Sequence, residues 1–366
     1  MRRFVAIALL AFAPLAHAFD SAWTHVATVT LDATYIDEAP PVVPVYLSGF
    51  DSTWHGAIQA DADDIRVTED DDTTEREYYL VAYDSGADTG LIIVNVDGYA
   101  SASVDKDLRV WVGNSGASAG STTSTFTSTG YVGVWFPGES TSDASGGGRT
   151  LTAVNTPGTA AVSALEMDAA TYDGTSQYHY VDSSPRTGWP VTSEVISSAD
   201  NTTHLGTVVA IAVSSGNNPL NILSMDGTTG DAVRAAYRGD SGSISLAYSS
   251  ASFSAATYTY GATSRDANTG TSTAYISGGS AGTNTTTITT PTMNRLSIGV
   301  LRNNSISGYL DGNVAYAAVS DEVRSADYVT TMQDAWFTGA FRTYSATESN
   351  GSGASGHPWF YLRYRQ

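Results

Sequence analysis

Cysteine is absent from this sequence of 366 residues, and lysine occurs only once, as Lys106. Without cysteine the chain has no disulfide bond, no thiol nucleophile and no cysteine-ligated metal site. Its folded state must therefore rely on cores that are large enough to be stable without covalent cross-links. The length is too great for one ordinary core and suits two domains.

Positive charge is also scarce, since 17 Lys and Arg face 37 Asp and Glu and the formal net charge is −20. So acidic a chain repels phosphate backbones, and we do not expect nucleic acid as a partner. After the N-terminus no run approaches the roughly 18 apolar residues of a membrane span, so membrane insertion is not expected. The charge is interpreted first as a source of solubility in an external medium.

The N-terminus has the layout of a secretory signal of the bacterial type. Arg2 and Arg3 precede an apolar stretch, 4–15, and Ala16-His17-Ala18 is a small-x-small cleavage site. This pattern predicts that residues 1–18 are removed and that the mature chain is extracellular, on the cell surface or periplasmic.

Apolar residues alternate with polar ones over several short stretches. Ala27, Val29 and Leu31 alternate with two threonines, and 43–47 and 108–112 follow the same pattern. A period of two, interrupted by turn clusters such as Asp97-Gly98 and Asp311-Gly312, is typical of half-buried β-strands. The sequence therefore predicts an all-β protein of two tandem antiparallel β-sandwich domains.

One short helix is expected near the C-terminus. Ser325 can cap it, and Val329, Met332 and Trp336 would share one face.

Segment 113–130 is almost wholly small and polar and suits a linker or an ordered edge between two domains. We expect a first domain over 19–127, a second over 128–341, and a Gly/Ser-rich segment with an aromatic tail over 342–366. The two domains are expected to fold independently. The aromatic tail, 357–362, is expected to dock as a final strand, with a free adhesive tail as the alternative.

The second domain resembles the concanavalin A-like (laminin-G-like) lectin/glucanase family. The resemblance is carried, in chain order, by YVGVW at 131–135, DASG at 143–146, ALEMD at 164–168, YHYV at 178–181, STAYISGG at 272–279, NRLSIG at 294–299 and GYLDG at 308–312. It implies a jelly-roll sandwich. A tryptophan usual for the family is absent before the AYIS strand, where Tyr258 and Tyr260 stand instead.

The first domain resembles a domain of unknown function, family 2341, which often precedes such a lectin-like domain. The carrying segments are PVYL at 44–47, DDIRVT at 63–68 and LRVWVGN at 108–114. Val112 departs from the family's tyrosine before Gly113-Asn114. Neither resemblance supplies a reaction.

Several short patterns look catalytic but lack the context that catalysis needs. Gly239-Asp240-Ser241-Gly242 matches a serine-protease loop, yet no histidine has the sequence context of a triad base, and a hairpin turn is the preferred interpretation. The G-x-S-x-G of 116–120 and the G-x-G-x-x-G of 351–356 follow from a Gly/Ser-rich composition. The paired carboxylates of concanavalin A-like glycanases are also missing, so no catalytic residue is predicted.

Binding residues follow from the resemblance and from the chemistry of aromatic rings, which stack on the apolar faces of sugars. Trp189, Tyr258 and Tyr260 are the predicted ligand contacts, with a role in the core as the alternative. No cofactor is predicted. Calcium is the one metal considered, with Asp168 and Asp173 as candidate ligands because related domains sometimes hold it at a loop rim.

These observations favour a secreted, non-catalytic binding protein that presents a lectin-like sandwich to a glycan or cell-surface polysaccharide. One alternative is a structural or adhesive subunit of an extracellular assembly, such as a surface appendage or virion fibre, with protein partners or self-assembly. The other is a glycan hydrolase with an unrecognised active site.

Overall fold

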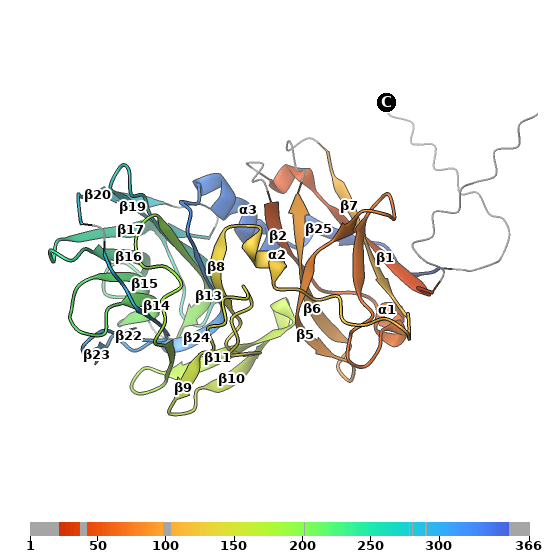
Figure 1. Cartoon of the computed structure of the whole chain (residues 1–366), viewed down its shortest axis with the longest axis horizontal. Helices are drawn as coiled ribbons and strands as arrows, with labels where there is room; N and C mark the ends of the chain where they lie inside the picture. The colour runs from red at the N-terminus through yellow and green to blue at the C-terminus, as the bar shows by residue number, and fades with distance from the viewer. Residues whose placement is uncertain are drawn as a thin grey trace, which may run out of the picture.

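A computed structural model describes residues 22–36, 42–97, 104–200, 202–277, 279, 281–289 and 291–350. The signal segment 1–18, the 351–356 glycine motif and the aromatic tail 357–362 lie outside these residues, so what we expect of them stays a prediction. In the described part of the chain no helix is long and apolar enough to cross a membrane. Figure 1 shows two bodies of antiparallel β-structure side by side, as the alternating sequence pattern predicted.

The first sandwich is built from two sheets. The larger has the order β25 (Arg342–Tyr344), β1 (His25–Leu31), β7 (Lys106–Val112), β3 (Arg66–Glu69) and β4 (Glu75–Arg76), with β26 (Glu348–Ser349) also on β1. The smaller has the order β2 (Val42–Leu47), β6 (Thr89–Asp97) and β5 (Tyr78–Asp84). Ala27, Val29 and Leu31 of β1 are buried, which confirms the period of two.

The second sandwich also has two sheets. The first has eight strands, in the order β10 (Gly158–Val162), β11 (Met167–Asp173), β24 (Asp311–Ser320), β13 (Val191–Ala199), β18 (Thr259–Arg265), β19 (Thr271–Ile276) and β20 (Gly282–Thr285), with β8 (Tyr131–Trp135) on β24. The other has seven, in the order β17 (Ile244–Ser252), β16 (Ala232–Arg238), β15 (Leu220–Asp226), β14 (Leu205–Ala212), β21 (Arg295–Ile298), β12 (Tyr178–Val181) and β9 (Thr152–Val154). A small hairpin, β22 (Leu301–Arg302) and β23 (Ile306–Ser307), lies beside β14.

Helices are short and few among the described residues. The α-helices are α1 (Ser52–Ala57), α2 (Ser124–Thr127) and α3 (Ala326–Phe337), and the 3-10 turns are η1 (Ala33–Tyr35), η2 (Ser163–Leu165) and η3 (Gly339–Phe341). The predicted C-terminal helix is confirmed as α3. The Ser325 side chain accepts a hydrogen bond from the Tyr328 backbone N–H, and Val329, Met332 and Trp336 are buried.

Helix α3 lies between the two sandwiches. The Trp336 ring centroid is 5.1 Å from that of Tyr46 on β2 and 5.3 Å from that of Tyr316 on β24. These contacts belong to one continuous apolar core that includes residues of both sandwiches. The outer face of the eight-stranded sheet is therefore covered, because α3 and the first sandwich pack against it.

Segment 113–130 lies against the first sandwich. Phe126 is buried, the Thr122 N–H donates to the Tyr78 carbonyl, and the Arg66 guanidinium donates to the Ser118 carbonyl. After α3 the chain returns to the first sandwich, where β25 and β26 pair with β1. The strands of that sandwich thus come from both ends of the described chain.

Candidate ligand-binding face

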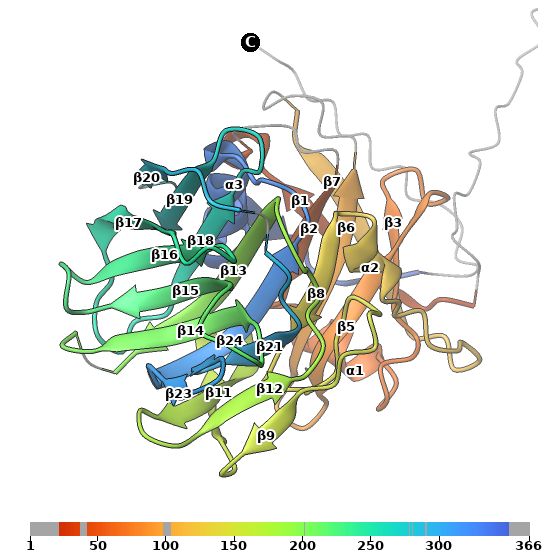
Figure 2. The ribbon, with the colours of Figure 1, turned by 60° about the vertical axis from the view of Figure 1, so that its left-hand side comes forward.

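The outer face of the seven-stranded sheet is open in the sense that the first sandwich does not pack on it, and a small apolar cluster of Ala210, Ala212, Leu220, Ile222 and Ala236 is buried at its centre. Figure 2 shows this sheet turned toward the viewer, and Figure 1 shows its strands on the side away from the first sandwich. The opposite sheet contributes Ile196, Tyr260 and Tyr316 to the core between the sandwiches. A ligand that binds to an outer sheet face of the second sandwich can therefore reach only the seven-stranded sheet.

Strand alternation decides which side chains β12 presents on this face. His179 points inward, where its Nδ1 lies 2.9 Å from the Tyr172 hydroxyl. Because successive side chains of a strand point to opposite faces, Tyr178 and Tyr180 point outward. The same rule places Arg295 on the outer face, since Leu296 and Ile298 of β21 belong to the inner core.

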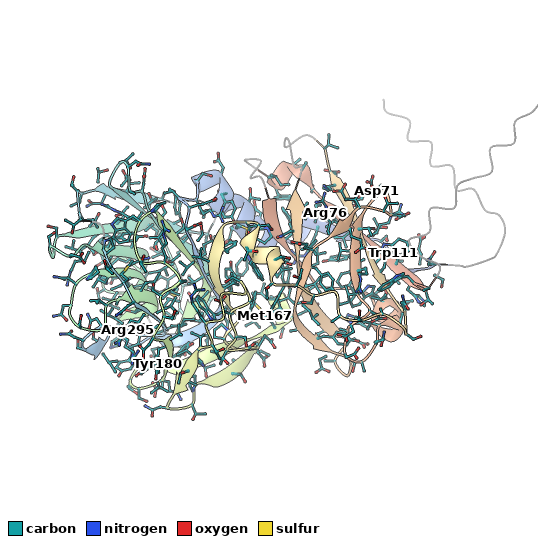
Figure 3. All side chains as sticks on the ribbon, in the orientation of Figure 1. Asp71, Arg76, Trp111, Met167, Tyr180 and Arg295 are labelled. Atoms are coloured by element: carbon teal, nitrogen blue, oxygen red, sulfur yellow. The ribbon has the colours of Figure 1, made fainter. Side chains whose placement is uncertain are left out.

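Three tyrosine rings gather at this edge of the sheet. The Tyr178 centroid is 6.1 Å from that of Tyr180 and 6.2 Å from that of Tyr309. Tyr178 is mostly buried, whereas Tyr180 and Tyr309 are partly exposed. Figure 3 shows Tyr180 and Arg295 near each other on the second sandwich.

Two arginines lie beside these rings. The Arg302 guanidinium carbon is 3.9 Å from the Tyr180 ring centroid, and its Nη1 donates to Asp182 Oδ1 at 2.6 Å. Arg295 Nη2 lies 3.2 Å from the same oxygen, and its Nη1 donates to the Asn303 carbonyl. Burial and the neighbouring Arg302 lower the pKa of Arg295.

We name this group the Tyr–Arg patch, and its members are Tyr178, Tyr180, Asp182, Arg295, Arg302 and Tyr309. Two guanidinium groups share one carboxylate, so the patch is locally positive on a chain whose net charge is −20. Guanidinium groups donate planar pairs of hydrogen bonds, and tyrosine rings offer apolar faces with a polar tip. The patch can therefore bind a polar ring that carries hydroxyl or carboxylate groups.

Sequence reasoning did not select this patch, although the signal was present. Tyr178 and Tyr180 stand two residues apart in a predicted strand, which places both rings on one face. Arg302 and Tyr309 could not be added from the sequence, because their proximity to β12 depends on the order of strands in the sheet.

Trp189 lines a small pocket elsewhere in the second sandwich. It packs edge-on against Tyr237, with ring centroids 5.3 Å apart, and shares a pocket of about 110 Å³ with Arg265. Its indole N–H has no hydrogen-bond partner among the described residues. A cavity of this volume is too small for a sugar ring and does not by itself support a sugar contact. The ligand role of Trp189 therefore stays a prediction.

The structure separates Tyr258 and Tyr260 from Trp189. Tyr260 is fully buried between the sandwiches, and its hydroxyl donates to Glu194 Oε2 at 2.7 Å. It fills the core and does not face a ligand, which corrects the prediction for this residue. The physical reason is that α3 and the first sandwich cover its sheet face. Tyr258 is only partly buried and packs against the same core.

Glu194 is the centre of a buried polar network. Its Oε2 accepts hydrogen bonds from Tyr131 and Tyr260, both at 2.7 Å, and the Arg324 Nε lies 3.9 Å from its Oε1. Burial raises the pKa of this carboxyl group, although Arg324 opposes the shift. Glu194 is fully buried, so it serves the interface between the sandwiches.

The two candidate calcium ligands lie in different surroundings. Burial tends to raise the pKa of Asp173. The backbone N–H groups of Ser176, Gln177 and Thr175 donate to its Oδ1, and these hydrogen bonds hold the pKa below its usual range. This carboxylate therefore closes its own turn. Asp168 lines a cleft between the sandwiches. No group of three or more His, Asp or Glu side chains suited to a metal ion occurs in the described ranges.

The segment Gly239–Gly242 forms the predicted hairpin turn between β16 and β17. Ser241 is exposed, and its backbone N–H donates to the Thr289 hydroxyl. The four-residue match to a protease loop is thus accounted for by turn geometry.

Solved structures with a similar fold share little sequence with this chain. No protein-family model matches the chain, and no curated protein matches it either. A CBM40 module of a Ruminococcus gnavus sialidase is 13% identical, with 40% of this chain and 84% of that one covered and a TM-score of 0.35. Domain 4 of an extracellular arabinanase from Geobacillus stearothermophilus is 17% identical, over 56% and 98% of the two chains, with a TM-score of 0.45. A pentraxin from Limulus polyphemus is 14% identical, over 44% and 80%, with a TM-score of 0.36. At these values no binding residue is carried over.

Proposed function

We propose that this chain is a secreted, non-catalytic protein that binds a glycan through the Tyr–Arg patch. One observation carries the proposal: partly exposed tyrosine rings and two arginines meet at one edge of the open sheet. Rings that stack on sugar faces, flanked by groups that donate hydrogen bonds to sugar oxygens, are the usual means of glycan recognition.

The charges of the patch favour a glycan that carries carboxylate groups. Arg295 and Arg302 share the single carboxylate of Asp182, which leaves guanidinium N–H groups without an anionic partner. These N–H groups can donate to a carboxylate of the ligand. A neutral sugar would have only the stacking contribution and weaker hydrogen bonds. We therefore expect uronate- or sialate-bearing glycans to bind more tightly than neutral glycans of the same length.

The patch supports binding and not hydrolysis. Glycoside hydrolysis generally needs two carboxyl groups on opposite sides of the scissile bond, and Asp182 is the single carboxylate of the patch.

Secretion rests on the signal pattern of residues 1–18. Mass spectrometry of the exported protein should give an N-terminus at Phe19.

A glycan array, followed by calorimetry on the best acidic glycan, tests the proposal. Tyr180→Ala and Arg302→Gln should each weaken binding at least tenfold, because each removes a stacking surface or a donor pair. Tyr248→Ala and Arg238→Gln are matched controls on the far side of the same sheet, on β17 and β16. Equal weakening by the controls, or the absence of any array signal, would contradict the patch as the glycan site.

Two further arms separate the alternatives. We expect binding to persist in EDTA, because the patch has no cluster of acidic ligands for calcium; loss of binding in EDTA would point to a metal-dependent site. Size-exclusion chromatography with light scattering tests the rival role as a structural or adhesive subunit. Concentration-dependent assembly without glycan binding would favour that role.

A further inference from the structure

A cleft of about 600 Å³ lies where the two sandwiches meet on their lower side in Figure 1. One wall is the β5–β6 hairpin of the first sandwich, and the other is formed by residues from β10 to the start of β11 in the second. Met167, labelled in Figure 3, lines this second wall. The Gly90 N–H donates to Glu166 Oε2 at 3.1 Å and connects the two walls.

All the charged groups that line the cleft are acidic, and the other polar lining groups are the hydroxyls of Tyr83, Ser85, Thr89 and Ser163. Four carboxylates from both sandwiches line it, Asp84, Glu139, Glu166 and Asp168, and no Lys, Arg or His stands among its lining residues. Between them lie small apolar surfaces such as Ala82, Ala161 and Val162. Since ionised carboxylates only accept hydrogen bonds, the complementary ligand is rich in donors and carries positive charge.

Backbone groups hold three of these carboxylates in place through one oxygen each. The Asp168 N–H donates to Glu139 Oε1, the Gly90 N–H to Glu166 Oε2, and the Gly86 N–H to Asp84 Oδ1. The second oxygen of each is left to receive a hydrogen bond from a ligand. Burial, with Asp168 nearby, raises the pKa of Glu139, so a bound cation would relieve an unfavourable concentration of negative charge.

A second observation points to a ligand at the same place. His55 is only 5% exposed, and neither of its ring nitrogens has a hydrogen-bond partner among the described residues. Its ring is nearly parallel to that of Tyr83, at 6.2 Å between centroids, and Tyr83 lines the cleft. The Tyr83 hydroxyl is also buried without a partner. Buried polar groups are nearly always paired, so the Tyr83 hydroxyl at the cleft wall and the His55 ring stacked beside it, which is not itself a lining residue, call for an additional partner.

The lining discriminates between classes of ligand. Anionic sugars and phosphates are repelled by the carboxylates. A metal ion needs converging ligands, and the described residues contain no such cluster. A neutral sugar can use the lining hydroxyls, but it carries no positive charge to offset the four carboxylates. An ammonium group has three donors and no acceptor, and the methylene groups beside it match the apolar surfaces between the carboxylates.

We propose that this cleft binds an aliphatic polyamine, with its ammonium groups against Asp84, Glu139, Glu166 and Asp168 and its methylenes against the alanines and Tyr83. The site is independent of the Tyr–Arg patch, which has the opposite charge. Lysine side chains share the alkylammonium chemistry, so a lysine peptide is included in the test to separate the two sources.

Isothermal titration of the mature full-length chain with spermidine tests the proposal. The double variant Glu139→Gln and Asp168→Asn keeps the volume of both side chains and the acceptor oxygen of residue 139, and it should weaken binding at least tenfold. A matched control, Glu75→Gln with Asp240→Asn, makes the same change of net charge at exposed positions outside the cleft lining. It should leave the affinity within about twofold, because exposed distant charges are screened.

A second variant makes the result independent of any effect on folding. Ser85→Arg places a cation on an exposed turn residue that lines the cleft, and it should abolish spermidine binding without a change in melting temperature. Trilysine should bind more weakly than spermidine; tighter binding of trilysine would assign the cleft to a protein partner and overturn the polyamine proposal. Equal weakening in the matched control, or no measurable spermidine binding at millimolar concentration, would also overturn it, whatever the glycan array shows.

Discussion

His179 shows how one buried residue couples stability to pH. Burial lowers the pKa of its imidazole to about 4 from an ordinary value of 6.5. Between these values the unfolded chain binds a proton that the folded chain does not, so acidification favours unfolding. The stabilisation is fully present above pH 6.5 and is lost as pH falls toward 4.

We therefore expect the free energy of unfolding to fall by about 3 kcal/mol between pH 7 and pH 4 through His179 alone, at 1.36 kcal/mol per pKa unit. Urea unfolding across this pH range measures it. The variant His179→Asn has no titrating group here and should show a correspondingly smaller pH slope than the wild type. Identical slopes would mean that His179 is not buried as the structure has it.

At the scale of elements, helix α3 connects the two sandwiches through Trp336. Its ring packs against Tyr46 of the first sandwich and Tyr316 of the second. Because it touches both, the loss of this side chain leaves a cavity in the shared core. The helix is thus more important for joining the bodies than its short length suggests.

Trp336→Ala should lower the free energy of unfolding by about 3 to 5 kcal/mol, the usual cost of deleting a large buried aromatic side chain. Asp327→Asn, at an exposed position in the first turn of the same helix, should cost less than about 1 kcal/mol. Chemical denaturation of both variants measures the difference. Similar losses would show that the helix contributes through its surface charge and not through the core.

At the scale of the whole molecule, the continuous core bears on how the two sandwiches fold. The composition of 113–130 led us to expect independent domains. The structure instead shows apolar residues of both sandwiches in one cluster, with β25 and β26 paired to β1. A second sandwich expressed alone would expose its share of this cluster and leave β25 without a partner.

We expect residues 131–350 alone to bind the dye ANS and to melt at a lower temperature than residues 22–350. Adding residues 22–127 in trans should reduce the dye binding, because the fragment would cover the exposed face of the eight-stranded sheet. Dye fluorescence and calorimetry of the two chains measure this. A cooperative melt of 131–350 at the temperature of the longer chain would restore the expectation of independent folding.

Local patterns in the sequence determined the class of fold. Alternation over 27–31 and 108–112, the cap at Ser325, and the turn at Gly239–Gly242 each depend on neighbours within a few residues. Such features are independent of the rest of the chain, so strands, helix and hairpin were predictable.

Only the tertiary structure decided which faces are covered and which residues meet. Tyr180 and Tyr260 both lie in strands whose side chains point to alternate faces of a sheet. Tyr180 is on the outer face of the seven-stranded sheet, whereas Tyr260 lies beneath α3 and the first sandwich. Alternation assigns a side chain to a face but does not say what packs on that face. The cleft likewise combines Asp84 with Glu139 and Asp168, residues far apart in the chain. Their proximity follows from the docking of the two sandwiches, which depends on long-range apolar contacts that no local pattern encodes.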